Sequence, residues 1–137
     1  MPAFGTRSRE RLEQAHPYLQ LLFNEVVKEF DCSILEAYRG KEKQDRMVLD
    51  GKSKLGFPNS KHNKMPSLAV DVVPYFREAP HVQWANEKAF HVFAGYVLGV
   101  ADRLGIKIIW GGNWKNEDIF RQDFEDLPHF QLELEKE

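Results

Sequence analysis

Apolar side chains recur at steps of three and four residues in two long stretches of the chain. Within residues 7–30 this spacing indicates an amphipathic helix, but Pro17 interrupts it, so we predict that the main helix starts near Pro17 after an earlier turn. Within residues 84–104 a wide apolar stripe predicts the longest helix, and Gly105 is suited to ending it. Both stretches therefore present an apolar face that must be buried.

Four shorter stretches have the composition of β-strands. They are rich in β-branched or alternating apolar residues and lie at residues 31–38, 68–73, 106–110 and 128–134. These strands are short and partly consecutive along the chain. We therefore expect an α+β fold, in which residues 1–137 form a single small domain with a mainly antiparallel sheet and helices packed on one side of it.

Polar segments connect these elements. Residues 41–50 predict a short polar helix that stops at Gly51. Residues 51–66 are rich in Gly, Pro, Ser, Asn and Lys, which is typical of a loop, and a loop of this length in so small a domain is usually functional. Residues 115–125 are also polar and are expected to be partly helical.

Charge and composition exclude several classes of function. With 19 basic and 21 acidic residues the net charge is −2, so we expect no nucleic-acid partner, because phosphate binding needs a surplus of Lys and Arg. The chain contains no run of 18 apolar residues, so we expect no membrane span. The N-terminus does not resemble a signal peptide. The single cysteine, Cys32, cannot form an intrachain disulfide and is expected to be buried. We expect a monomer.

Histidine and carboxylate residues occur in three short clusters that could bind a metal. Two histidines and one carboxylate, with water in the fourth position, form a common catalytic zinc set. His62 lies in a predicted loop, Asp71 in the next strand and His129 in the last strand, so the three could converge over a sheet. The clusters are Ser60-Lys61-His62, Ala69-Val70-Asp71 and Asp126-Leu127-Pro128-His129.

Each of these residues also has a structural interpretation without a metal. His62 could be a solvated loop residue, and His129 could be a core histidine with one hydrogen bond. Asp126 lies in an acidic stretch and could be a surface charge. Asp71 is flanked by valines, so it either faces solvent at a strand end or pairs with a cationic group. Residue spacing alone leaves these alternatives open.

Four ordered motifs resemble one known family. They are Ser60-Lys61-His62, Ala69-Val70-Asp71, Trp110-Gly111-Gly112-Asn113-Trp114 and Asp126-Leu127-Pro128-His129-Phe130. Together they resemble the VanY-like D-Ala-D-Ala carboxypeptidases, and more closely the branch of L-alanyl-D-glutamate endopeptidases that includes many bacteriophage endolysins. The resemblance runs from about Tyr38 to Leu132 and implies the fold shared by these peptidases and hedgehog-type domains.

The resemblance also implies which residues carry the chemistry. It makes His62, Asp71 and His129 the ligands of a Zn²⁺ cofactor, and Asp126 the general base and acid. Relatives usually have a shorter interval between the matching histidine and aspartate, with a glycine in it. Here the interval is 71 − 62 = 9 residues.

Three further residues are candidates for contact with substrate. The resemblance implies that Arg39 holds the substrate and polarises the scissile carbonyl, a task that suits a guanidinium. The alternative for Arg39 is an ion pair at the surface. Gln44, on the short polar helix, and Ser60 are weaker substrate-binding candidates.

The function expected from this resemblance is a zinc peptidase that cuts the stem peptide of peptidoglycan between L-Ala and D-Glu. Such a phage lysin would be made in the host cytoplasm without a signal peptide, and would reach the wall in the periplasm after release through a holin. One alternative is a D-alanyl-D-alanine carboxypeptidase, which the four motifs do not separate from the endopeptidases. The other is a zinc-stabilised binding domain without enzymatic activity.

Overall fold

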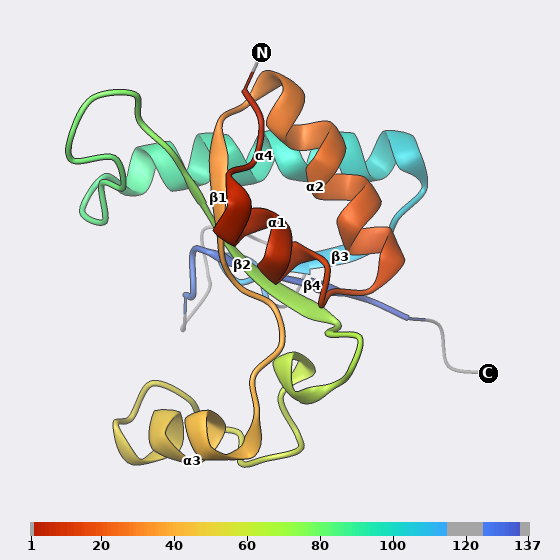
Figure 1. Cartoon of the computed structure of the whole chain (residues 1–137), viewed down its shortest axis with the longest axis vertical. Coiled ribbons are helices and arrows are strands. Elements are labelled where there is room, and N and C mark those ends of the chain that lie inside the picture. Colours follow the sequence, from red (N-terminus) through yellow and green to blue (C-terminus); the bar gives the residue numbers. More distant parts are fainter. Residues whose placement is uncertain (1, 115–124, 135–137) are drawn as a thin grey trace.

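A computed structural model describes residues 2–114 and 125–134, and Figure 1 shows the arrangement of its elements. The prediction for residues 115–125 falls, apart from Glu125, on residues outside the described ones. Four antiparallel strands and four α-helices form a small α+β fold, as expected from the sequence. Among the described residues, none of the helices has the length and apolar character needed to cross a membrane.

The N-terminal stretch contains two helices separated at Pro17. Helix α1 spans Thr6–Leu12 and helix α2 spans Pro17–Glu29. Pro17 occupies the first turn of α2, where its missing N–H costs nothing, and the His16 side chain caps that turn by accepting a hydrogen bond from the Tyr18 amide. The predicted break is confirmed, whereas the earlier turn is a helix of seven residues.

The longest helix is α4, Glu87–Leu104. It begins three residues later than predicted, because the Asn86 side chain accepts a hydrogen bond from the Ala89 amide and so caps the helix there. It ends as predicted at Gly105, whose φ of 71° lies in the left-handed region that glycine adopts readily. Most of the apolar stripe is buried, but Leu98 is only partly buried and Leu104 is exposed at the end of the helix.

All strand pairs of the sheet are antiparallel, in the order β1-β2-β4-β3. Side chains alternate between the two faces of a strand, so Val70 and Val72 of β2 and Phe130 of β4 share the core face. Phe130 packs edge-on against Phe23 of α2 and Phe93 of α4, with ring centroids 5.5 and 6.0 Å away. The strands are β1 (Cys32–Glu36), β2 (Ala69–Pro74), β3 (Ile108–Trp110) and β4 (His129–Leu132).

Two short helices lie at the other end of the sheet from α2 and α4. Figure 1 shows α3, Lys41–Leu49, at the end of the molecule opposite α2 and α4. The chain that leads from α3 to β2 passes through the 3-10 helix η1, Lys61–Asn63. The loop predicted over residues 51–66 thus includes one short helical turn. A cavity lies where the loop after α3 and η1 face strands β2 and β4.

Cys32 is buried at the start of β1, as expected. Burial raises the pKa of its thiol, and the neighbouring charge of Asp31 raises it further. A thiol with a raised pKa is a poor nucleophile. Cys32 is therefore a packing residue of the core.

Candidate metal centre and active site

The three residues expected to bind metal lie together on the face of the sheet opposite the apolar core. Asp71 of β2 is the direct partner of His129 of β4 in the antiparallel register, so both side chains project to the same side. His62 arrives from η1, where the Ser60 hydroxyl accepts a hydrogen bond from the His62 amide at 3.2 Å. Oδ1 of the Asn63 side chain accepts a hydrogen bond from the Ser60 amide at 3.0 Å, and this capping box fixes the turn that directs His62 towards the strands.

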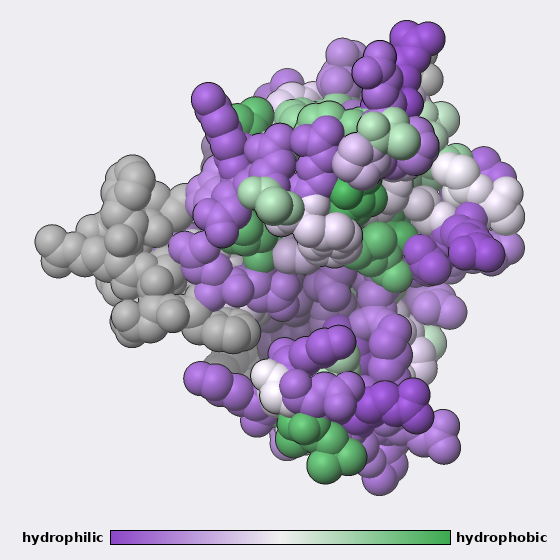
Figure 2. All heavy atoms as spheres, turned by 90° about the vertical axis from the view of Figure 1, so that its left-hand side faces the viewer, coloured by the Kyte–Doolittle hydropathy of each residue, from purple (hydrophilic) through white to green (hydrophobic). Residues whose placement is uncertain are grey.

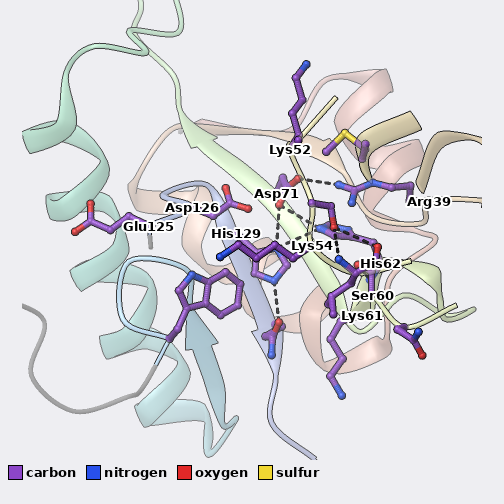
Figure 3. Close-up of a pocket in the computed structure, with 17 residues that line it drawn as sticks. Arg39, Lys52, Lys54, Ser60, Lys61, His62, Asp71, Glu125, Asp126 and His129 are labelled. Atoms are coloured by element: carbon purple, nitrogen blue, oxygen red, sulfur yellow. Dashed lines mark hydrogen bonds and ion pairs between the residues drawn. The ribbon is translucent and has the colours of Figure 1, made fainter. Parts of the chain in front are cut away.

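One atom from each side chain forms a nearly equilateral triangle. The Nε2 atom of His62 lies 3.2 Å from Oδ1 of Asp71 and 3.2 Å from Nδ1 of His129. The third side, between Nδ1 of His129 and Oδ1 of Asp71, is 3.3 Å. Figure 3 shows the three side chains converging from β2, β4 and η1.

Hydrogen bonds on the far side of each imidazole fix which nitrogen faces the triangle. Nδ1 of His62 lies 2.7 Å from the Ala37 carbonyl oxygen, which can only accept, so His62 is protonated at Nδ1. Nε2 of His129 donates in the same way to Oε1 of Gln131 at 2.9 Å. The nitrogens left facing the triangle are lone-pair atoms, as metal-ligating histidines require.

This geometry fits zinc. A tetrahedral ion at about 2.0–2.1 Å from each ligand places neighbouring ligands about 3.3 Å apart, which matches all three sides of the triangle. Two imidazole nitrogens and a carboxylate oxygen repel one another at this separation unless a proton or a cation lies between them. The donor set and its spacing therefore suit a divalent cation with an open fourth position.

The close approach of the three side chains also shifts the pKa values of Asp71 and His129. Burial alone would raise the pKa of Asp71, but hydrogen bonds from His129 and His62 outweigh it and hold that pKa well below its usual range. Burial disfavours the charged form of His129, yet its hydrogen bond with Asp71 and the carboxylate charge raise the His129 pKa above the ordinary value. Both pKa shifts therefore favour a positive charge next to the Asp71 carboxylate.

Asp126 lies beside the triangle and lines the same cavity. Its amide donates to the Gly111 carbonyl at 2.8 Å, and its own carbonyl accepts from the His129 amide at 3.0 Å. Gly111 permits this approach, because a Cβ at that position would lie 2.0 Å from the Asp126 carbonyl oxygen. Burial raises the pKa of the Asp126 carboxyl, and the charge of Asp71 raises it further.

Arg39 is buried next to the triangle and lines the cavity, so the alternative of a surface ion pair does not describe it. Its Nε donates to Oε1 of Glu36 at 2.6 Å, and its Nη1 donates to Oε1 of Gln44 at 3.0 Å. Its Nη2 lies 3.7 Å from Oδ2 of Asp71, the oxygen that points away from the histidines. Arg39 therefore joins the Asp71 carboxylate to a polar network that includes Glu36 and Gln44.

Gln44 and Ser60, both predicted to contact substrate, occupy different places. Gln44 is fully buried and is not among the residues that line the cavity; its carbonyl oxygen accepts from Arg39 and from Asn63. Ser60 does line the cavity, but its hydroxyl caps η1 by accepting from the His62 amide. Both residues hold their neighbours in place in this structure.

The cavity itself has a volume of about 590 Å³. Figure 2 shows a recess flanked by hydrophilic residues, between the upper body of the molecule and the lower part that carries α3. Its walls come from the loop after α3, from η1, from β2 and β4, and from Trp114, whose ring centroid lies 4.9 Å from that of His129. A peptide segment fits in a cavity of this size.

Three contacts of the site were not predicted from the sequence. Gln131 could have been found, because it lies two positions after His129 on the same face of a strand. Glu36, the partner of Arg39, lies at the end of β1, where a glutamate has the pattern of an ordinary exposed residue. The Ala37 carbonyl gives no signal in the sequence, because any residue could supply it.

Comparison with known proteins agrees with this geometry. Residues 2–133 match the family described as phage L-alanyl-D-glutamate peptidase. The chain is similar to the crystal structure of the Serratia marcescens L-Ala D-Glu endopeptidase ChiX, with a TM-score of 0.76 and 30% identity over 96% of this chain and 91% of that one. No curated protein sequence matches significantly. The match over nearly its whole length shows that this chain belongs to the phage L-alanyl-D-glutamate peptidase family.

Proposed function

We propose that this protein is a zinc-dependent endopeptidase that hydrolyses the L-Ala–D-Glu bond of peptidoglycan stem peptides and so degrades the bacterial cell wall. The observation that carries this proposal is the triangle of His62, Asp71 and His129 beside a cavity that also holds Asp126. Family membership supports the peptide bond chosen. As a phage lysin, the protein is expected to reach the wall after holin-type release.

The residues of the chain divide the reaction between them. His62, Asp71 and His129 would hold the ion, and a bound zinc supplies a Lewis acid that polarises a carbonyl and lowers the pKa of water. Asp126 accepts a proton from the attacking water and delivers it to the departing amine of D-Glu. Arg39 donates hydrogen bonds towards the carbonyl oxygen as negative charge develops on it. The cavity walls orient the stem peptide across these groups.

Digestion of purified muropeptides tests the proposed bond. We expect mass spectrometry to find stem peptides that begin with D-Glu and sugar fragments that retain L-Ala, and we expect EDTA to abolish both. Loss of a terminal D-Ala in their place would mean that the protein is a carboxypeptidase. Zinc binding with no cleavage of any muropeptide would favour a binding domain.

Zinc affinity is expected to depend on pH with a definite sign. Because the His129 pKa is raised in the metal-free protein, a proton must leave before zinc can bind. The affinity should therefore fall as pH decreases, by about tenfold per pH unit for each proton displaced, and this fall should begin above the pH at which an ordinary histidine titrates. Competition with a chromophoric chelator at a series of pH values measures it. An affinity that stays constant between pH 5 and 8 would contradict proton displacement at this site.

A further inference from the structure

Charged residues of both signs line the cavity. Lys52, Lys54 and Lys61 line it, although the whole chain has a net charge of −2. Figure 3 shows Lys52 above the triangle and Lys61 below it, with Asp126 and Glu125 to the left. We call the three lysines the basic wall of the cavity.

Two lysines of the basic wall have charges that no internal group neutralises. Within residues 2–114 and 125–134, the ammonium groups of Lys52 and Lys61 have no ion-pair partner. By contrast, Lys41 of α3 pairs with Asp45 at 2.7 Å. An ammonium without an internal partner can bind an anionic substrate group without first breaking an ion pair. The flexible stem of a lysine also lets its ammonium reach over the cavity.

The loop that carries Lys52 and Lys54 is anchored to the active site. The amide nitrogen of Gln44 donates to Oγ of Ser53 at 2.9 Å and to the Leu55 carbonyl at 2.6 Å. The same side chain accepts from Arg39 through its carbonyl oxygen. Lys52 and Lys54, on either side of Ser53, are thus held at a fixed position relative to Arg39.

The proposed substrate carries an anion next to the bond that is cut. A glutamyl residue that continues a peptide through one of its carboxyl groups keeps the other as a free carboxylate. In an L-Ala–D-Glu bond that residue supplies the leaving amine, so its free carboxylate enters the cavity together with the scissile bond. This chemistry complements an unpaired ammonium at the cavity wall.

We propose that the basic wall binds the free carboxylate of the D-glutamyl residue, and that Lys52 and Lys61 thereby select acidic stem peptides over stem peptides in which this carboxylate is amidated. The inference rests on the proposed function and adds to it the group by which the substrate is recognised. Because these lysines are exposed, each contributes modestly, by roughly twofold to fivefold in affinity. Recognition should therefore appear mainly in KM.

The test compares two peptides that differ only at this carboxylate, one with D-Glu and one with its amide. Both are assayed with the wild type, Lys52→Ala, Lys61→Ala and the double variant. Lys64→Ala is the matched control, because Lys64 is exposed and close in sequence but does not line the cavity. We expect the wild type to have a lower KM for the acidic peptide, the double variant to lose most of this preference, and the control to keep it.

An unchanged preference in the double variant would overturn the proposal. Equal slowing of both peptides would overturn it as well, because the lysines would then act on the general charge of the substrate. If the wild type cleaves neither peptide, the proposed function fails by itself. Calorimetry on the binding of the same two peptides then decides this inference separately, and equal affinities for the wild type would refute it.

Discussion

Replacing Asp126 by Asn is expected to lower kcat on the stem peptide by roughly 10²–10⁴-fold, the usual contribution of a positioned general base. The amide has nearly the shape of the carboxyl but cannot accept the proton of the attacking water. Asp126 is not one of the three residues of the metal-binding triangle, so zinc content should stay at the wild-type level. Single-turnover kinetics and elemental analysis of the same preparation measure both quantities.

Glu125→Gln is the matched control for this experiment. It removes the same charge from the adjacent residue, which also lines the cavity but is exposed. We expect it to change kcat by less than about threefold, as for a surface charge. A similar loss in both variants would mean that the charge of this segment matters and not the proton transfer. Full activity of Asp126→Asn would assign the base to another group.

Arg39→Lys is expected to reduce kcat by roughly 10²–10³-fold, which is the typical loss when a donor to a developing oxyanion is removed. Lysine keeps a positive charge beside Glu36 and Asp71, so the charge balance around these two carboxylates is preserved. It cannot reproduce the planar guanidinium that contacts Glu36 and Gln44 together. The variant should therefore fold but bind the transition state poorly.

Arg46→Lys provides the comparison for Arg39, because Arg46 is exposed on α3, which begins two residues after Arg39, and does not line the cavity. It should leave kcat and KM unchanged. Circular dichroism and thermal melting of both variants separate loss of folding from loss of chemistry. Wild-type kcat in Arg39→Lys would show that any cation suffices at this position, and would limit Arg39 to an electrostatic role.

Much of the fold was predictable because local chemistry and tertiary packing agree. Pro17 favours a helix start and Gly105 favours a helix end through local backbone geometry alone. The apolar stripe of α4 favours a helix with one buried face, and the folded protein has the same arrangement. The strands were also predicted, because Val70, Val72 and Phe130 are buried where alternation places them. The predicted start of α4 at Trp84 was wrong, because Asn86 caps the helix and Trp84 lies before this cap.

The convergence of the site could be predicted only in part. Asp71 was conspicuous because a carboxylate among valines needs a cationic partner. His62 lies nine residues before Asp71, and its approach to Asp71 depends on the capping box of Ser60 and Asn63. This capping box belongs to a single 3-10 turn, which has no strong signature in the sequence. The ligand roles rested on the resemblance, and the short distances between the atoms now give them a geometric argument.

Gln44 is the site residue whose environment was hardest to predict from the sequence. A glutamine in a polar helix has the pattern of an exposed residue, and its contacts are far apart along the chain. Its amide bonds to Arg39, Asn63, Ser53 and the Leu55 carbonyl, which compensates for the cost of full burial. Such a network depends on the tertiary fold and cannot be inferred from periodicity.

Metal content measured by elemental analysis tests the account most directly. The protein and its His129→Ala variant are purified without added zinc, and both are then offered zinc and dialysed. We predict about one zinc ion per chain in the wild type and a large loss in the variant, which lacks one side of the ligand triangle. No zinc in the wild type, or equal zinc in both, would contradict the claim that His62, Asp71 and His129 form the metal centre.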